Sequence, residues 1–392
     1  MRQTSIAHGA FLCDIAGFWF AFKSCLTFLF FRADPQLGTA FRLAAGFVWL
    51  VIVVGYAVLS PASRHERRQY NASLRWIVIY LALAGFSILW TSSSSPAIAA
   101  GYWAGLVAEV FAVYLLLRQP PVEDNARRMM RGFIVGALAL AIVAWIAPAT
   151  DDLRLGNEEF LHPNLIGFYF AIGALAAAHL APKQKLWSAP AIALGVTTIR
   201  TLSKGAIVAF LVAGLYCLMR GSKISRKARV WIGILSTLVL VSFWGLAEAY
   251  FNLYATGNNV ETLTGRTYIW SQTIELFLEK PWLGYGFDSF RWTFPAFADF
   301  LPNHAHNEFF QQLFTYGLVG ILVVISVYWS FYRHVRASER SGLRSLAMAI
   351  LILVLVRGIV DTDQFGLCFP LWLMTMFAMA LVPAGSSRTV PS

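Results

Sequence analysis

The chain has 392 residues, of which 58% are hydrophobic and only 13% are charged, whereas about 25% of the residues of an average soluble domain are charged. This composition argues against a soluble fold. It also argues against a nucleic-acid-binding protein, despite a net charge of +11, because such proteins gather their basic residues on a solvated face of a polar chain. Long apolar runs separate the charges, which predicts a polytopic membrane protein.

Twelve apolar stretches bounded by charges, Pro or Gly predict membrane-spanning helices. They lie at residues 11–31, 41–60, 76–91, 97–117, 132–149, 163–181, 186–200, 204–219, 230–248, 308–332, 345–360 and 367–383. The seventh and eighth are short, so they form either two spans or one re-entrant or kinked pair. We therefore predict an all-α transmembrane bundle of about twelve spans, with residues 1–392 forming a single integral membrane domain.

The basic residues predict the orientation of this bundle, because cytoplasmic loops retain Lys and Arg and translocated loops do not. Of the 31 basic residues, 21 lie at the two chain ends and in alternate loops, namely 64–75, 118–131, 183–185, 220–229 and 333–344. Both termini are therefore expected to be cytoplasmic. The other ten basic residues break this rule and by default mark functional sites or ion pairs: Lys23, Arg32, Arg42, Arg154, Arg200, Lys204, Arg266, Lys280, Arg291 and Arg357.

Two of the predicted outer loops are long. Residues 150–163 are acidic, and residues 249–306 form the largest polar segment of the chain. Within the larger loop, five apolar residues recur at helical spacing between Ile269 and Leu278, and Pro281 ends the pattern. This predicts an amphipathic helix that lies on the membrane surface. The Gly- and aromatic-rich residues 281–287 then suit covering a cavity, stacking on sugar rings or anchoring at the interface.

His306 is the first candidate for chemistry, because it lies just before the tenth predicted span. Asn303 or Asn307 is expected to cap this helix, and Glu308 suits its first turn. The positive end of the helix disfavours an imidazolium, so His306 can act as a general base or ligand, unless it only caps the helix or contacts the interface. A polar stripe continues along the helix and requires a water-filled cavity or polar partners: Glu308, Gln311, Gln312 and Thr315.

Cationic residues form a second candidate site near the same membrane boundary. If residues 197–204 continue one helix, Arg200 and Lys204 share a face with two Thr hydroxyls, which suits an anion such as a diphosphate. Alternatively, these cations pair with Asp361, Asp363 or lipid phosphate. Arg266 opens the amphipathic helix, where a cation opposes the helix dipole and a bound anion would remove the conflict.

A resident metal ion is not expected. His304 and His306 lack an evident third ligand in the sequence. Asp361 and Asp363 form a DxD pattern, but we interpret it as a solvated turn or an ion-pair partner on the outer side. The first outer loop, residues 32–37, has one acid and is too short for a metal-binding loop. The sequence therefore favours a metal-independent mechanism.

These residues resemble the O-antigen ligase and O-antigen or exopolysaccharide polymerase superfamily. The family pattern of His-Asn, nine residues and Gly-x-x-Gly is met at residues 306–307 and 317–320. Four further blocks are similar to family blocks, and together they define an O-antigen ligase-related region over residues 154–330: 162–167, 202–206, 263–270 and 280–287.

The resemblance implies a GT-C-like membrane glycosyltransferase that moves a glycan from undecaprenyl diphosphate to an acceptor hydroxyl at the periplasmic face of the bacterial inner membrane. His306 would be the catalytic base, and Arg266 would bind the diphosphate together with Arg200 or Lys204, since Lys204 stands where many ligases have Arg. Because the donor is already activated, no cofactor is required. Further substrate contacts are expected from His162, Asn164, His304, Asn307 and Glu308.

The resemblance leaves the acceptor open. A polymerase would use a second lipid-linked repeat, and Lys204 with residues 263–267 favours this branch; a ligase would use lipid A-core. The implied partners also include membrane lipid and a chain-length regulator protein, but no nucleic acid. A transporter is the remote alternative, for which no inverted repeat is evident; its intramembrane charges would be Asp14, Lys23, Glu109 and Arg357.

Overall fold

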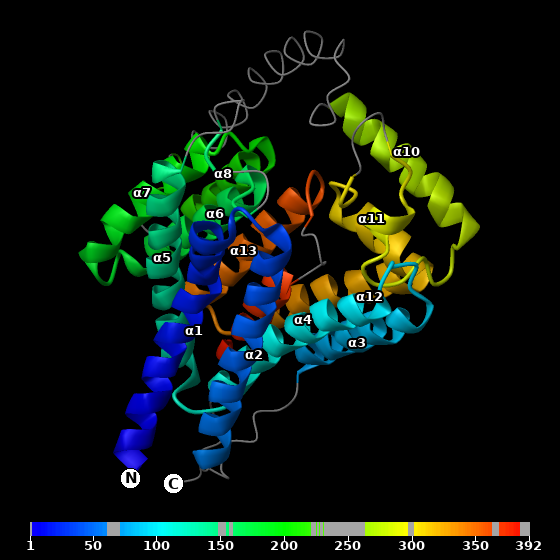
Figure 1. The fold of residues 1–392 in the computed structure, drawn as a ribbon. Coiled ribbons are helices and arrows are strands. Elements are labelled where there is room, and N and C mark those ends of the chain that lie inside the picture. Colours follow the sequence, from blue (N-terminus) through cyan, green and yellow to red (C-terminus); the bar gives the residue numbers. More distant parts are fainter. Residues whose placement is uncertain are drawn as a thin grey trace.

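The computed structural model describes residues 2–60, 71–147, 154–156, 160–220, 225, 227, 230, 263–296, 302–362 and 368–384. Within these ranges, every regular element is a helix, which confirms the predicted all-α class (Figure 1). The long helices are α1 (Arg2–Phe31), α2 (Pro35–Leu59), α3 (Ala72–Phe86), α4 (Pro96–Leu117), α5 (Val122–Ile146), α6 (Pro163–Leu180) and α12 (Glu308–Ala337). The shorter helices are η1 (Ser87–Trp90), η2 (Lys185–Trp187), α7 (Ser188–Arg200), α8 (Lys204–Arg220), α10 (Leu263–Glu279), α11 (Phe290–Thr293), α13 (Gly342–Gly358) and α14 (Cys368–Ala380).

Among the described residues, seven helical stretches are long and apolar enough to cross a membrane: α1, α2, α3 with η1, α4, α5, α6 and α12. Four of the predicted spans coincide with shorter helices, α7, α8, α13 and α14, which have 13 to 17 residues. The predicted span at residues 230–248 lies outside the described residues. The protein is therefore a multi-pass helical membrane protein, and the count of twelve spans stays a prediction.

Several helices begin or end further out than the apolar runs. Helix α5 begins at Val122 rather than near residue 132, and α12 continues to Ala337. The additional turns carry basic residues that the sequence had placed in loops, such as Arg128 and Arg333. A helix does not have to end where its apolar stretch ends, because its backbone hydrogen bonds continue into the interfacial region.

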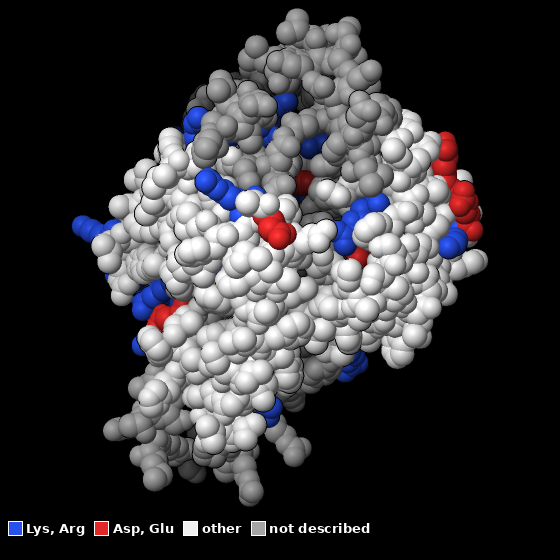
Figure 2. Space-filling view, viewed as in Figure 1, with Lys and Arg blue, Asp and Glu red and all other residues white. Residues whose placement is uncertain are grey.

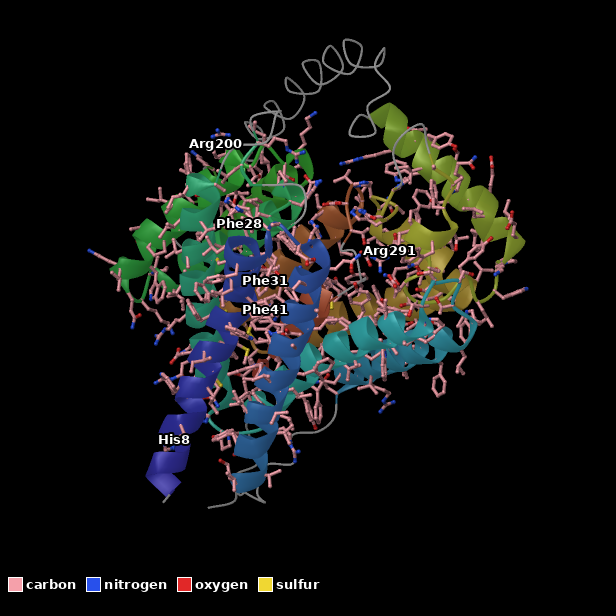
Figure 3. All side chains as sticks on the ribbon, in the orientation of Figure 1. His8, Phe28, Phe31, Phe41, Arg200 and Arg291 are labelled. Atoms are coloured by element: carbon pink, nitrogen blue, oxygen red, sulfur yellow. The ribbon has the colours of Figure 1, made fainter. Side chains whose placement is uncertain are left out.

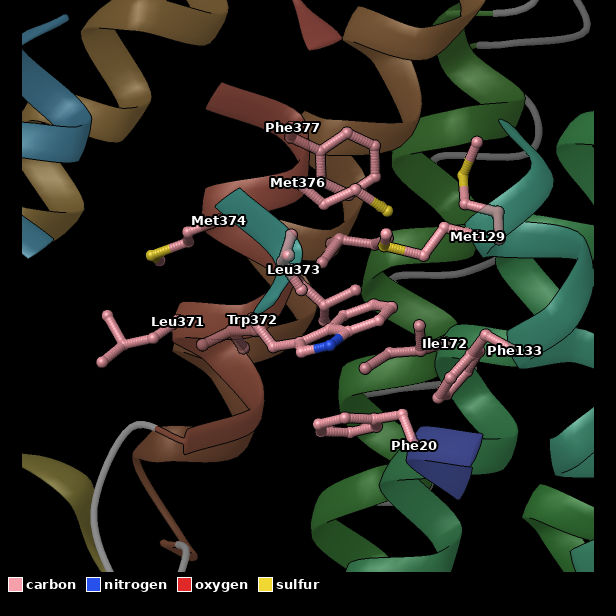
Figure 4. Close-up of a cluster of buried hydrophobic side chains, with 14 of the residues drawn as sticks. Phe20, Met129, Phe133, Ile172, Leu371, Trp372, Leu373, Met374, Met376 and Phe377 are labelled. Atoms are coloured by element: carbon pink, nitrogen blue, oxygen red, sulfur yellow. The ribbon is translucent and has the colours of Figure 1, made fainter. Parts of the chain in front are cut away.

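Helix α14 packs mainly on α3, α4 and α5, and its apolar side chains meet others from α1, α5 and α6 in the core (Figure 4). The Trp372 ring lies tilted against Phe20 and Phe133, with ring centroids 4.7 and 6.2 Å away. Close backbone approach holds α1 against α5, since a Cβ on Gly17 would meet the Met129 carbonyl oxygen. Small residues at such contacts are the usual means of packing helices in lipid.

The intramembrane charges that a transporter would need are ion-paired in the structure. Lys23 of α1 pairs with Glu109 of α4, and both are buried. Asp14 of α1 accepts from Arg128 of α5 at 3.0 Å. These pairs tie neighbouring helices together, so they have a structural explanation.

The helices that carry the candidate site lie on two sides of the molecule. Helices α6, α7 and α8 lie on one side and α10 and α11 on the other, with α13 between them (Figure 1). Figure 2 shows the described surface hollowed between these two sides, with acidic and basic side chains inside the hollow. The residues singled out by the sequence come from the helices around this hollow.

Candidate functional site

Asn307 fixes the start of α12. Its Oδ1 accepts hydrogen bonds from the Phe309 and Phe310 amides at 2.9 and 3.0 Å. Its Nδ2 donates to the Ile359 carbonyl at 2.7 Å. Asn307, and not Asn303, is therefore the helix cap, and the same side chain ties α12 to the segment that follows α13.

His306 is held beside a buried ion pair. Its backbone is left-handed, with φ at 48°, and its amide donates to His304 Nδ1 at 3.2 Å. His306 Nδ1 lies 3.6 Å from Asp361 Oδ1. Asp361 accepts from Arg357 at 3.1 Å, and both side chains are buried. The imidazole thus lies against a carboxylate whose charge is already compensated by a guanidinium.

These contacts set the protonation of the neighbouring groups. Burial raises the pKa of Asp361, but the charge of Arg357 and the adjacent histidines outweigh it and hold the pKa well below its usual value. Burial lowers the pKa of His304 well below that of a solvated histidine. Asp361 is therefore a carboxylate and His304 is neutral near pH 7.

Asp361 corrects one prediction from the sequence. It is 5% exposed, so it is not part of a solvated turn, although its interpretation as an ion-pair partner is confirmed. Its partner is Arg357, which lies one turn earlier and also stacks on Phe168 at 4.3 Å. The signal for this ion pair in the sequence was a carboxylate four residues after an intramembrane Arg. Asp363 lies outside the described residues.

Residues 359–362, which we call the α13 exit, join the other candidate residues. The Val360 carbonyl accepts from Arg266 Nη1 at 2.8 Å. The Thr362 hydroxyl donates to the buried Glu308 carboxylate. Gly205 packs so closely on Val360 that a Cβ there would lie 2.6 Å from Val360 Cγ2. The α13 exit thus brings Arg266 of α10, the start of α8 and the start of α12 to one place.

A second polar group lies at the start of α6. Asn164 Oδ1 accepts from Arg154 Nη2 at 2.7 Å and from Ser203 Oγ at 2.8 Å. His162 caps α6 by accepting from the Asn164 amide at 3.3 Å. The sequence blocks at 162–167 and 202–206 are therefore in direct contact, and Arg154 joins them.

Residues 197–204 do not continue one helix, so the condition for a shared face of Arg200 and Lys204 is not met. Helix α7 ends at Arg200 and α8 begins at Lys204, because Leu202 has a φ of 54° and the Ser203 hydroxyl accepts from the Ala206 amide as α8 begins. The guanidinium of Arg200, which Figure 3 labels, lies 5.8 Å from the Trp145 ring of α5. Lys204 instead precedes Gly205 at the α13 exit, so the two cations do not share a helix face.

The polar stripe of α12 has polar partners. Gln312 donates to Glu308 Oε1 at 2.8 Å and accepts from the Tyr80 hydroxyl at 3.2 Å. Gln311 accepts from the Ala305 amide at 2.8 Å, which holds the turn between the two histidines. These bonds confirm one of the two expected explanations of the stripe and fix the loop that presents His306.

Two glycine-containing blocks of the sequence bind each other. Helix α12 breaks at Gly317, where φ is 63° and ψ is −156°. Beyond the break, the Leu318 and Val319 amides donate to the Pro281 and Trp282 carbonyls at 2.8 and 3.2 Å. On the other side of the break, the Tyr285 and Gly286 amides donate to the Phe314 and Thr315 carbonyls at 3.0 and 2.8 Å. The residues 281–286, which we call the docking loop, therefore complete the broken helix.

The same geometry offers a set of metal donors that the sequence did not reveal. Ligand atoms of His304, His306 and Asp361 all lie within 4.8 Å of one another. Two histidines and a carboxylate can hold Zn²⁺, but a cation here would compete with Arg357 for Asp361. The sequence did not indicate Asp361 as a third ligand because it lies 55 residues after His306. Metal independence stays a prediction.

The chain is similar to a described family and to a known protein. Residues 189–325 match the model of the family described as O-antigen ligase. The chain is also similar to the exopolysaccharide production protein ExoQ of Rhizobium meliloti (strain 1021), with 23% identity over 380 residues, which cover 87% of this chain and 83% of that protein. The family match extends from α7 into α12 and contains Arg266, His306 and the docking loop. These similarities confirm the resemblance to the O-antigen ligase and O-antigen or exopolysaccharide polymerase superfamily that the sequence motifs predicted.

Proposed function

We propose that the protein is a glycosyltransferase that moves a glycan from undecaprenyl diphosphate to an acceptor hydroxyl at the periplasmic face of the bacterial inner membrane. The family match over residues 189–325, the similarity to ExoQ and the apolar helices support a membrane protein of the ligase or polymerase type. The observation that carries the finer proposal is the convergence of His306, Asp361 and Arg266 at the α13 exit. A base and an anion-binding cation are the two groups that this reaction needs.

His306 acts as the general base in this proposal. Because Nδ1 faces Asp361, Nε2 is the nitrogen that takes the proton of the acceptor hydroxyl. The hydroxyl oxygen forms a bond to the anomeric carbon, and the bond from that carbon to the phosphate oxygen breaks. The Asp361 carboxylate orients the ring and stabilises the imidazolium that forms. Such a base contributes about 10²–10⁴-fold to the rate.

Arg266 and Lys204 bind the leaving diphosphate, which departs with the electron pair of the broken bond. The bond to the Val360 carbonyl fixes the Arg266 guanidinium, and a fixed guanidinium stabilises developing phosphate charge without reorganisation. Lys204 is preferred to Arg200 because it begins α8 at the α13 exit, whereas Arg200 stacks on Trp145. The other predicted site residues hold these groups in place or contact the substrate: His162, Asn164, His304, Asn307 and Glu308.

The acceptor in this proposal is a second lipid-linked repeat, so the protein polymerises exopolysaccharide or O-antigen. The similarity to a protein named for exopolysaccharide production supports this choice. The family description supports the second candidate, a ligase that joins the glycan to lipid A-core. The glycans of a deletion strain distinguish them: single-repeat products indicate a polymerase, and complete loss of the attached chain indicates a ligase.

The test is a transfer assay with purified protein, lipid-linked oligosaccharide and candidate acceptors, in the presence and absence of EDTA. His306→Ala should lower kcat by about 10²–10⁴-fold, and Asp361→Asn should lower it less. His8→Ala is the matched control, because His8 is exposed at the far end of α1 (Figure 3). Full activity of His306→Ala would refute the base. Loss of wild-type activity with EDTA would refute metal independence and favour a metal ion at His304, His306 and Asp361.

A further inference from the structure

A charged and aromatic cluster lies on α11, apart from the α13 exit. Arg291 and Trp292 belong to α11. Asp288 precedes this helix and has a left-handed backbone conformation, with φ at 59°. Asp288 Oδ2 accepts from Arg291 Nη2 and from Ser93 Oγ, each at 3.2 Å. Ser93 belongs to the segment between η1 and α4, so the cluster connects two parts of the chain. The proposed mechanism uses none of these residues.

Arg291 holds an exposed indole in place. Its guanidinium carbon lies 5.0 Å from the ring centroid of Trp292 and 5.6 Å from that of Tyr102 in α4. Figure 3 labels Arg291 beside α11. Trp292 is 48% exposed, although large aromatic residues usually bury most of their surface. A rigid, exposed ring beside hydrogen-bonding groups is the arrangement that requires an explanation.

We propose that Trp292 and Arg291 form a saccharide subsite that binds a neutral sugar ring of the glycan substrate, an inference that rests on the proposed function. One face of a pyranose ring presents C–H groups, which pack on an indole. The ring hydroxyls accept hydrogen bonds from a guanidinium, which offers five N–H donors. Because Asp288 already compensates the charge of Arg291, the subsite suits a neutral sugar and not the diphosphate.

The subsite is rigidly connected to the turn that carries His306. Phe290 and Phe294, which flank Arg291 and Trp292, belong to one packed apolar cluster with Ala305 and Phe314. The Phe290 and Phe314 rings meet edge to face at 4.8 Å. Ala305 lies between the two histidines of the site. A sugar bound at Trp292 would therefore keep a fixed position relative to His306, as a glycan chain that extends from the reacting residue requires.

Trp282 shows what a membrane-anchoring tryptophan of the same region looks like. It is 68% exposed, and its exposed neighbours Leu278 and Leu283 are apolar, as expected of a residue that contacts lipid. Trp292 instead has Arg291 against its ring and Asp288 one turn earlier. The two exposed tryptophans thus differ in their surroundings, and Trp282 provides a matched control.

The test measures binding and transfer separately with the full-length protein in lipid nanodiscs. The probe is the single-repeat oligosaccharide obtained by partial acid hydrolysis of the strain's own surface polysaccharide, which carries no lipid or phosphate. Trp292→Ala should weaken its binding about tenfold, which corresponds to about 1.4 kcal/mol. Trp292→Phe should retain most of the affinity, and Trp282→Ala should retain all of it. In the transfer assay, Trp292→Ala should raise the KM for the glycan with kcat unchanged.

The outcomes separate this inference from the proposed function. If the wild-type protein transfers glycan and Trp292→Ala binds the probe with wild-type affinity, the subsite is refuted and the function stands. If the wild-type protein binds the probe through Trp292 but transfers nothing, the subsite stands and the function is refuted. Equal losses in Trp292→Ala and Trp282→Ala would show membrane anchoring and refute the subsite, as would competition of the probe by inorganic diphosphate.

Discussion

A single methyl group at Gly317 should separate the docking loop from α12. The Gly317 backbone, with φ at 63° and ψ at −156°, lies in a region that only glycine adopts readily, and another residue there costs about 1–3 kcal/mol. A Cβ would also lie 2.5 Å from the Trp282 carbonyl group. Relief of that clash breaks the two bonds from Leu318 and Val319 to the docking loop, each worth about 0.5–1.5 kcal/mol. Gly317→Ala should therefore destabilise the docked state by about 2–6 kcal/mol.

Thermal unfolding of the purified protein, together with limited proteolysis of residues 281–296, measures this effect. Gly317→Ala should lower the melting temperature, expose the docking loop to protease and reduce transfer. Gly55→Ala is the matched control, since nothing lies within 4 Å of the added Cβ in α2; alanine there should be neutral or stabilise by up to about 1 kcal/mol. Equal melting temperatures and equal protection of the loop in the two variants would refute the role of the break.

Three further predictions concern the charged residues. Lys23→Met should lower the melting temperature strongly, because an unpaired Glu109 in the bundle costs about 3–5 kcal/mol. Adding Glu109→Gln should restore much of the lost melting temperature. An unchanged melting temperature in Lys23→Met would contradict the buried pair. The pKa of His304 is lowered in the folded protein, so the unfolded chain binds this proton more readily and the free energy of unfolding should fall as the pH drops below about 6.5. His304→Gln should flatten this dependence in melting curves from pH 7.5 to 5. An equally steep dependence in the variant would contradict the prediction. Lys204→Ala should reduce the initial rate of transfer about tenfold or more, which is the effect of losing a charged hydrogen bond. Arg200→Ala should reduce this rate less. The reverse order would assign diphosphate binding to Arg200.

The sequence by itself determined the local features of this protein. Apolar runs placed the helices because a bilayer requires about 20 consecutive apolar residues for each span. The amphipathic pattern before Pro281 predicted a helix that the structure has as α10, Leu263–Glu279. The cap of α12 was narrowed to two asparagines, of which Asn307 is the one used. Each of these features depends on residues within a few positions of one another, so spacing and residue type were sufficient.

Only the tertiary structure decided which distant residues meet. Asp361 lies beside His306 because α13 ends against the start of α12, a contact that no local pattern encodes. Ser203, in the break between Arg200 and Lys204, donates to Asn164 of another helix, α6. The break in α12 at Gly317 likewise exists because the docking loop supplies its hydrogen bonds. Buried polar groups form hydrogen bonds with the partners that the packing brings near. The positions of helices along the sequence depend on local residues, but the packing of helices against one another depends on the whole chain.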